Sequence, residues 1–322
     1  MEGVDRYRVM EPMFECARVV MHHRGDRFAP AYVQGIAGTA FTIGGICPCA
    51  PTCVTVPRTT SELLALFGYE VTPVHYRAQA PEAEAEYAAF LQRLAASIAA
   101  GRPVITWHAF TYYEWDVVCG YREATGELVG YGSYAGGDAY AVSPQDRPKG
   151  GMDVTDTIAL LVGEKTGTFD ATVAEVEALR FAVEHAHSQK NAARCAEPEW
   201  VFLEGFLCYQ RWARDFGDPA RRRSQGDSYC LGVLDSTRRC AAAFVGDLAA
   251  RYPVAAGHLR AASEAFTREA ETLAALKPWL GWDAPEEPDA GRNAQVSALL
   301  ERAAEQYRQA IGRLESALPL VG

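Results

Sequence analysis

The sequence predicts an α+β domain at residues 1–166, followed by an all-α helical bundle at residues 167–322. The first part mixes short helical patterns with β-rich runs, glycine and proline, whereas the second repeats apolar residues at helical spacing almost throughout. A length of 322 residues suits about two domains, on a prior of roughly 100–200 residues each. With 49% apolar and 22% charged residues, the composition is that of an ordinary globular protein.

Helical patterns begin the first domain. Apolar residues recur at helical spacing after Pro12, which suits a first turn, and Gly25 suits a stop. Thr59 and Glu62 have the spacing of a capping box, in which each side chain accepts the backbone N–H of the other residue. Helices are expected at residues 12–23, 29–37, 59–68 and 81–101.

Runs rich in β-branched and aromatic residues predict the strands. Pro73 interrupts one run, and the segment EATG at residues 123–126 has the composition of a hairpin turn. Three of the runs follow one another closely, which predicts an antiparallel sheet behind the helices. Strands are expected at residues 39–45, 69–76, 102–110, 114–121, 127–134 and 156–164.

Long amphipathic patterns joined by short connections make up the second domain and predict a helical bundle. The apolar faces of its last helices would allow a homodimer. The basic cluster ARRRSQG at residues 220–226 is expected in a solvated turn between helices. The helices are expected at residues 170–188, 200–216, 229–252, 258–280 and 293–318.

The net charge, the length of the apolar runs and the first residues of the sequence limit the possible partners and compartment. A net charge of −10, spread along the chain, argues against nucleic acid and anionic membranes. No apolar run approaches the roughly 18 residues of a membrane span. The first residues lack the basic region and apolar stretch of a signal peptide. The sequence therefore predicts a cytoplasmic protein that acts on or binds a small molecule.

The nine cysteines are an odd number, and a disulfide framework is not expected in the cytosol. The segment CPCAPTC places Cys47, Cys49 and Cys53 close together, as thiolate ligands of zinc or copper would be. A structural zinc site normally needs four ligands, and no second pair of cysteines or histidines completes this one. We therefore expect neither a metal nor a cofactor.

Aromatic residues gather around a single acid, Glu114, at the head of the apolar run WDVVCGY. Glu114 could act as a general base with a raised pKa, bind an amine or guanidine group, or form a salt bridge at a strand end. The aromatic rings could line a pocket for a cationic or aromatic ligand, or fill the interface with the bundle. The candidate substrate-binding residues are Trp107, Tyr112, Tyr113, Trp115, Tyr131 and Tyr134.

Three segments of the first domain resemble papain-like cysteine peptidases: FECARVVMHHRG, LAASIAAGRPVITW and EWDVVCGYREATGELVGY. They look most like the branch that includes C39-type bacteriocin-leader peptidases and the N-terminal domain of butirosin biosynthesis protein H. In that branch a nucleophilic cysteine opens the first helix, and a histidine at the head of a later strand is the base. The resemblance implies a papain-like fold. Because butirosin biosynthesis protein H is an acyltransferase, the resemblance also implies acyl transfer to a small amine in bacterial secondary metabolism.

The resemblance assigns Cys16 to the nucleophile position, although Cys16 lies about one turn into the helix, where the dipole stabilises a thiolate less. Glu114 stands where the family has its histidine, and a carboxylate there would raise the pKa of the thiol. The base would then have to be His108, His22 or His23. The candidate catalytic residues are therefore Cys16, His108 and Glu114.

Two hypotheses follow. In the first, Cys16 is acylated by a small-molecule or carrier-protein-bound acyl donor, and His108 or Glu114 moves protons. In the second, the module has lost catalysis and binds a small molecule or peptide through Glu114 and the surrounding aromatic rings. Preferential labelling of Cys16 would support the first, and ligand-dependent stabilisation lost in Glu114→Gln would support the second.

Overall fold

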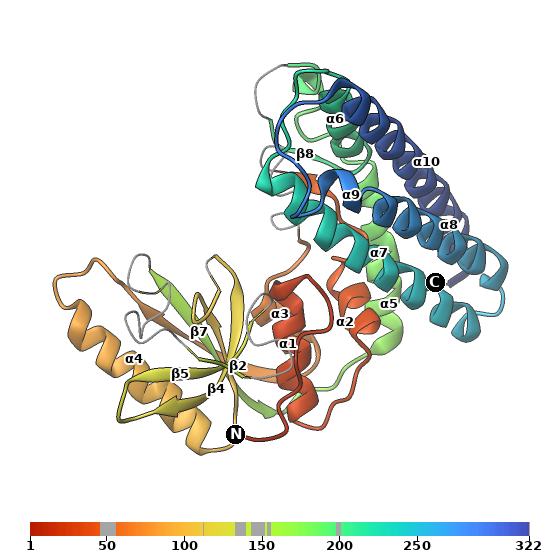
Figure 1. Ribbon diagram of the computed structural model, residues 1–322. Helices are drawn as coiled ribbons and strands as arrows, with labels where there is room; N and C mark the ends of the chain where they lie inside the picture. Colours follow the sequence, from red (N-terminus) through yellow and green to blue (C-terminus); the bar gives the residue numbers. More distant parts are fainter. Residues whose placement is uncertain are drawn as a thin grey trace. The chain divides into compact units, whose positions relative to one another are not determined.

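The chain forms a mixed α and β structure with two compact units, as the computed structural model in Figure 1 shows. The structure describes residues 1–45, 56–111, 113–132, 140–142, 152, 156–197 and 201–321. Unit 1 consists of residues 1–30 and 58–169, and unit 2 consists of residues 31–57 and 170–322. The predicted α+β class is confirmed. The units differ from the expected domains in that residues 31–57 belong with the helical unit.

Unit 1 contains a six-stranded antiparallel sheet in the order β2-β7-β3-β4-β5-β6. Pro73 is accommodated because β2 lies at the edge of the sheet, where a missing N–H costs no ladder hydrogen bond. The expected hairpin joins β4 to β5, with Gly126 in the left-handed conformation at a φ of 74°. The strands are β2 (Tyr69–Tyr76), β3 (Val104–Trp107), β4 (Trp115–Arg122), β5 (Glu127–Tyr131), β6 (Ala141–Val142) and β7 (Thr157–Lys165).

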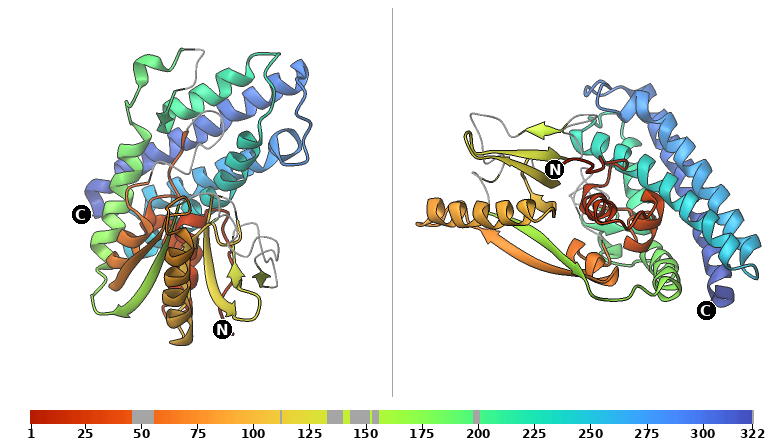
Figure 2. Two further views of the ribbon diagram at one scale, coloured as in Figure 1. Left: turned by 90° about the vertical axis from the view of Figure 1, so that its left-hand side faces the viewer. Right: turned by 90° about the horizontal axis from the view of Figure 1, so that it is seen from below.

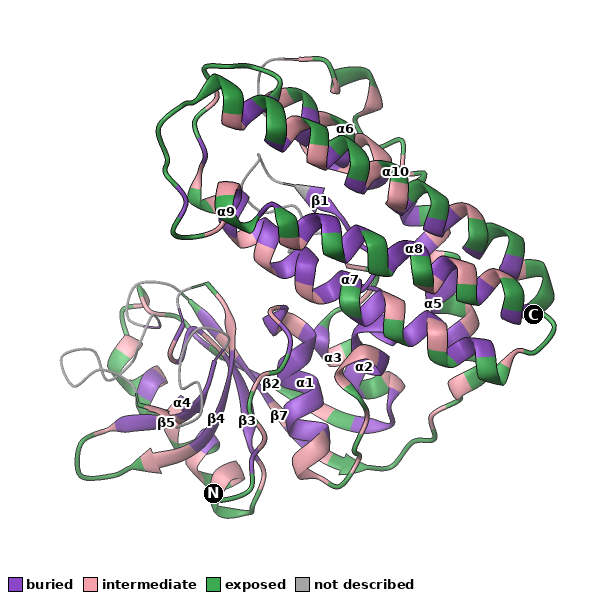
Figure 3. Ribbon diagram, turned by 45° about the vertical axis from the view of Figure 1, so that its right-hand side comes forward, coloured by how far each residue is buried: buried purple, intermediate pink, exposed green. Residues whose placement is uncertain are grey.

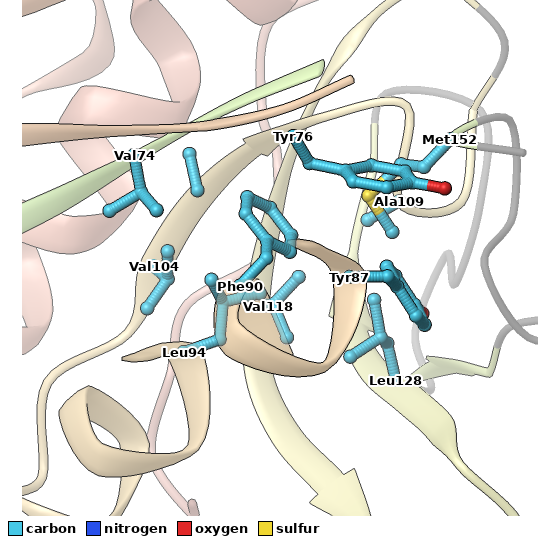
Figure 4. Close-up of a cluster of buried hydrophobic side chains, with 11 residues drawn as sticks. Val74, Tyr76, Tyr87, Phe90, Leu94, Val104, Ala109, Val118, Leu128 and Met152 are labelled. Carbon is cyan, nitrogen blue, oxygen red and sulfur yellow. The ribbon is translucent and has the colours of Figure 1, made fainter. Parts of the chain in front are cut away.

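Three helices accompany the sheet: α1 (Pro12–His23), α3 (Thr60–Leu66) and α4 (Ala83–Ala99). The capping box of Thr59 and Glu62 forms as predicted at the start of α3. Helix α4 packs Phe90 and Leu94 on the sheet, as Figure 4 shows for the surrounding cluster. That cluster also contains Val74, Tyr76, Tyr87, Val104, Ala109, Val118, Leu128, Met152 and Ala159.

The other face of the sheet is also covered. Ile105 and Val117 alternate along their strands with Val104 and Val118, which face α4, so they point to the opposite face. Both are fully buried. Helix α1 contacts β3 and β4, and most of its residues are buried. Helix α1 is therefore held against the strands that carry the predicted site.

Unit 2 is a bundle in which α8 contacts both α7 and α10, and Figure 2 shows these helices side by side. Figure 3 shows buried and exposed stripes along α8 and α10, as amphipathic helices require. The expected bundle helices are found with shifted ends. Elements of this unit are α2 (Pro30–Ala37), β1 (Gly44–Gly45), α5 (Ala171–Ala186), a 3-10 turn (Ala192–Arg194), β8 (Leu203–Glu204), α6 (Gly205–Phe216), α7 (Gln225–Arg251), α8 (Ala256–Ala275), α9 (Lys277–Leu280) and α10 (Ala290–Val321).

The strand expected at residues 39–45 is wrong for most of its length, because only Gly44–Gly45 pairs with a strand, β8. Side chains from distant helices bind the backbone before it instead. Arg238 donates to the carbonyls of Ala40 at 2.7 Å and Thr42 at 3.1 Å. The Tyr307 hydroxyl donates to Phe41 O at 3.0 Å. These contacts use the carbonyls that a strand would have offered to a neighbouring strand.

Within the described ranges, no helix has the length and apolar character to cross a membrane. The basic cluster at residues 220–226 leads into α7, where Ser224 and Asp227 form a capping box. Arg221 pairs with Asp227 at 3.0 Å, and Arg222 pairs with Glu287 at 2.6 Å. The cluster lies between helices, as expected, and its charges are paired; the expected solvation is wrong for Arg223, which is buried.

Candidate functional site

The Cys16 thiol is buried in α1 and has a local hydrogen-bond partner. Its Sγ donates to the carbonyl of Met13 at 3.1 Å, and the residue has no exposed surface. Burial raises the pKa of this thiol well above its usual value, and the nearby carboxyl groups of Glu11, Glu15 and Asp116 raise it further. A neutral, shielded thiol is the resting state that this position favours.

His108 directly follows β3 and is also buried. Its Nδ1 accepts the backbone N–H of Tyr113 at 2.6 Å, so the proton of the neutral ring sits on Nε2. Burial lowers the pKa of His108 to about 4, which keeps the ring neutral at physiological pH. Nε2 has no hydrogen-bond partner among the residues that the structure describes. The His108 ring therefore hydrogen-bonds to the backbone of Tyr113 rather than to a thiol.

The β3–β4 loop, as we name residues 108–111, 113 and 114, is closed by its own hydrogen bonds. The backbone N–H of His108 donates to the Glu114 carbonyl at 3.0 Å, next to the bond between Tyr113 and the His108 ring. His108 and Tyr113 have φ angles of 67° and 57°, in the left-handed region that bulky residues rarely adopt. Such conformations persist only where surrounding contacts hold them.

Asp116, the second residue of β4, was not among the predicted site residues. Its Oδ2 accepts the N–H groups of Phe110 at 2.6 Å and Thr111 at 2.9 Å, and the side chain is fully buried. Burial raises the pKa of this carboxyl to about 7, although the two N–H groups and the Thr111 hydroxyl oppose the rise. A lone acid inside the apolar run WDVVCG is the sequence signal that would have indicated it.

An N-terminal arm completes the surroundings of β4. Buried Arg18 binds the arm, with Nη1 on Asp5 Oδ2 at 2.8 Å and Nη2 on the Arg6 carbonyl at 2.8 Å. This arm brings the Tyr7 hydroxyl to the Trp115 carbonyl, to which it donates at 2.7 Å. Burial raises the pKa of Tyr7 well above its usual value, and the nearby Cys16 and Asp116 add to the rise. No feature of the sequence around Tyr7 indicated this contact.

The aromatic candidates differ in exposure. Tyr113 is 68% exposed and lies edge-on to His108, with 5.0 Å between ring centroids. Trp107 and Trp115 are half-buried and meet edge-to-face at 5.2 Å. Tyr131 is buried and contacts Tyr140 at 4.7 Å, so it serves packing. Tyr112 and Tyr134 lie outside the described residues.

The structure brings Trp107, His108, Tyr113, Glu114 and Trp115 together on and beside one loop. The thiol of Cys16 bonds to Met13 and makes no hydrogen bond with the His108 ring in the described part of the chain.

The cysteine-rich segment is outside this description. Cys47, Cys49 and Cys53 lie beyond the described residues, so their expected lack of a metal stays a prediction. In the described ranges, no three histidine, cysteine or acidic side chains are grouped as a metal ion would require.

Comparison with known proteins adds no relative. No protein-family model matches the chain, and no curated protein matches it. The function must therefore be argued from the site itself.

Proposed function

We propose that unit 1 is a papain-like module that binds a small molecule or peptide bearing an amine or guanidine group, without catalysis. Tyr113, Trp107 and Trp115 would contact the ligand, and the Glu114 carboxylate would pair with its cationic group. Aromatic faces attract cations, and an acid beside them adds a direct ion pair. This is the second of the two functions that the sequence left open.

The observation that carries the proposal is the conformation of Tyr113. A large aromatic side chain that is 68% exposed sits on a left-handed residue, and a ring nitrogen of His108 fixes its backbone N–H. Neither burial nor backbone preference explains that arrangement, because the ring is in solvent and the φ angle is unfavourable. Rigid, exposed aromatic residues are instead typical of recognition surfaces, since they lose little entropy on binding.

The surroundings of Cys16 favour binding over catalysis. A cysteine nucleophile needs a thiolate, which an adjacent base or a positive environment supplies. Here the nearby ionisable groups Glu11, Glu15 and Asp116 are acids that raise the pKa of the thiol. His108, the expected base, already accepts a backbone N–H at Nδ1.

A thermal-shift series tests the proposal with benzamidine and tyramine as cationic aromatic probes and benzyl alcohol as a neutral one. We expect the cationic probes to raise the melting temperature of the wild type. Glu114→Gln should lose that rise, and Tyr113→Ala should reduce it. Cys16→Ala should keep it, because the thiol is not at the proposed surface.

The controls separate recognition from folding. Glu123→Gln, an exposed acid in the β4–β5 turn, should behave as the wild type. A set of cationic probes that stabilise Glu114→Gln as much as the wild type would reject the role of Glu114. Binding that disappears in Cys16→Ala, with the fold intact, would reject the non-catalytic proposal.

One observation favours the acyl-transfer alternative. Asp116 carries a carboxyl with a pKa of about 7 and is close enough to influence the thiol of Cys16. Its ionised form could take the thiol proton; the thiolate would attack an acyl carbonyl, and the leaving group would depart with a proton before an amine takes the acyl group.

Alkylation by iodoacetamide across pH, read by peptide mass spectrometry, distinguishes the two functions. The binding proposal predicts that Cys16 reacts only when the protein unfolds. Rapid labelling of Cys16 in the folded protein, with an apparent pKa below the free value of about 8.5, would favour acyl transfer.

A further inference from the structure

We propose that Asp116 is the positioning residue of the β3–β4 loop: its carboxyl holds the backbone that presents Tyr113 and Glu114 to a ligand. What the loop does rests on the proposed function above. How the loop is held does not, because it follows from contacts within the described residues.

The first step is the pair of hydrogen bonds at one oxygen. Asp116 Oδ2 accepts from two consecutive backbone N–H groups, those of Phe110 and Thr111, at 2.6 and 2.9 Å. Buried backbone N–H groups are costly when unpaired, and no strand partner is available to residues in a loop. The carboxyl therefore supplies what a neighbouring strand supplies elsewhere in the sheet.

The second step is that His108 and Asp116 hold different parts of the loop. The bonds of His108 close its two ends, since the His108 N–H reaches Glu114 O and its ring accepts the Tyr113 N–H. Between these ends, Phe110 and Thr111 are fixed by Asp116. Without this central anchor, the left-handed conformations of His108 and Tyr113 would lose part of the support that maintains them.

The third step concerns the other carboxyl oxygen. Thr106 lies opposite Asp116 in the β3–β4 ladder, so the two side chains share a face of the sheet. A Cβ added at Gly132 would lie 2.1 Å from Asp116 Oδ1 and 2.5 Å from Thr111 Oγ1, which places these two oxygens near each other. In the described part of the chain, Asp116 Oδ1 and the buried hydroxyls of Thr106 and Thr111 have no hydrogen-bond partner of normal geometry.

These neighbours explain why the carboxyl can hold the loop in either protonation state. A hydroxyl donates to an ionised carboxylate and accepts from a protonated one. Oδ2 can then keep both N–H groups while Oδ1 exchanges a proton. An asparagine amide has the same shape, with an oxygen for the two N–H groups and an NH₂ group for the threonine hydroxyls. Asp116→Asn is thus the conservative replacement that should preserve the loop.

Amide hydrogen exchange, resolved by residue with NMR, tests the proposal on the whole chain. In Asp116→Ala we expect exchange at Phe110, Thr111 and Tyr113 to become at least about tenfold faster, because the anchoring bonds are gone. In Asp116→Asn the same amides should stay within about threefold of the wild type. The amide of Val118, in the middle of β4, reports global opening and should be unchanged in both.

Loop exchange that is unchanged in Asp116→Ala, or equally fast in both variants, would overturn the proposal. If Asp116→Ala does not fold, Gly132→Ala takes its place, because the added methyl group would press on Oδ1 while the carboxyl remains. It should speed exchange in the loop but not at Val118. Unchanged loop amides in that variant would reject the role of Asp116.

The same variants separate this proposal from the function. If Asp116→Ala loosens the loop but benzamidine and tyramine bind neither it nor the wild type, Asp116 positions the loop and the proposed ligand class is wrong. If the probes bind wild type and Asp116→Asn tightly and Asp116→Ala at least about tenfold more weakly, both proposals hold. Equal binding by all three, despite a loosened loop in Asp116→Ala, would show that ordering the loop is not what ligand recognition needs.

Discussion

Arg238 in unit 2 and Asp116 in unit 1 are both buried ionisable residues that hold the backbone of a loop. Arg238 donates to the carbonyls of Ala40 and Thr42, and Asp116 accepts the N–H groups of Phe110 and Thr111. The two residues differ in the groups that lie beside their side chains. Arg238 has a buried counter-ion in Glu269 at 2.7 Å, whereas Asp116 Oδ1 lies near the Thr111 hydroxyl and has no hydrogen-bond partner among the described residues.

The segments that Arg238 and Asp116 hold differ in the exposure of their aromatic side chains. Arg238 fixes a segment whose Phe41 is fully buried, with the Tyr307 hydroxyl on the Phe41 carbonyl. Asp116 fixes a loop that exposes Tyr113. A buried group with its counter-ion secures the interior of unit 2, while Asp116, which has no counter-ion among the described residues, holds a loop that exposes Tyr113. The comparison separates a stabilising polar network from one that, under the proposed function, would serve recognition.

The largest expected effect is on Arg238. Replacing it by alanine leaves the Glu269 carboxylate buried without its cation, and this should lower the free energy of unfolding by about 3–5 kcal/mol. Urea denaturation followed by circular dichroism measures the change. The adjacent Arg239, exposed and paired with Asp235, provides the matched control, because its replacement by alanine should cost less than about 1 kcal/mol. Equal costs would mean that the Arg238 network does not stabilise unit 2.

The next effect is a pH dependence at Asp116. Its pKa of about 7 in the folded protein lies above the unfolded value of 3.8, so folding favours the protonated form. The stability that Asp116 contributes is therefore complete below pH 4 and is lost as the pH rises towards 7. The difference corresponds to roughly 4 kcal/mol at most between pH 4 and pH 8.

Asp116→Asn should accordingly become more stable relative to wild type as the pH increases. Urea denaturation of both proteins at pH 4, 6 and 8 would show the trend. Glu123→Gln, at an exposed position in unit 1, should show no comparable trend. A stability difference for Asp116→Asn that is constant across this range would show that the carboxyl is not held in its protonated form.

The smallest effect compares two left-handed positions, Tyr113 and Gly126, with φ angles of 57° and 74°. Tyr113→Gly should raise the free energy of unfolding by about 1 kcal/mol, because it relieves strain, while it removes ligand binding. Gly126→Ala should lower stability by a similar amount, since its Cβ would meet nothing and only the backbone conformation would suffer. A Tyr113→Gly protein less stable than wild type would mean that the tyrosine ring contributes more to folding than to recognition.

The sequence predicted those elements whose signals are local. The helix at residues 12–23 has the predicted bounds, and the capping box of Thr59 and Glu62 forms. The sheet strands follow the β-rich runs, including the one with Pro73, because an edge strand tolerates proline. The caps of these helices lie within a few residues, and the strands are visible from their local composition although β2 pairs with the distant β7.

The remainder depends on partners far away in the chain. The carbonyls of residues 40–42 are bound by Arg238 and Tyr307, so the apolar, β-branched composition of this segment indicated a strand that does not form. The Tyr7 hydroxyl reaches Trp115 across 108 positions of sequence. The ring of His108 accepts the Tyr113 N–H within the loop, a contact that its place in the sequence did not indicate.

The assignment of residues 31–57 to unit 2 has a consequence for synthesis of the chain. The Ala40 carbonyl accepts from Arg238, which lies 198 residues later in the chain. At a synthesis rate of about 5–20 residues per second, the carbonyl remains without that partner for about 10–40 s. Throughout that interval, Phe41 lacks Phe244 and Phe266, the rings of later helices against which it packs. Nascent chains are thus most exposed to aggregation and to chaperones while unit 1 is being completed, and a chain stopped at residue 166 would keep Phe41 permanently uncovered.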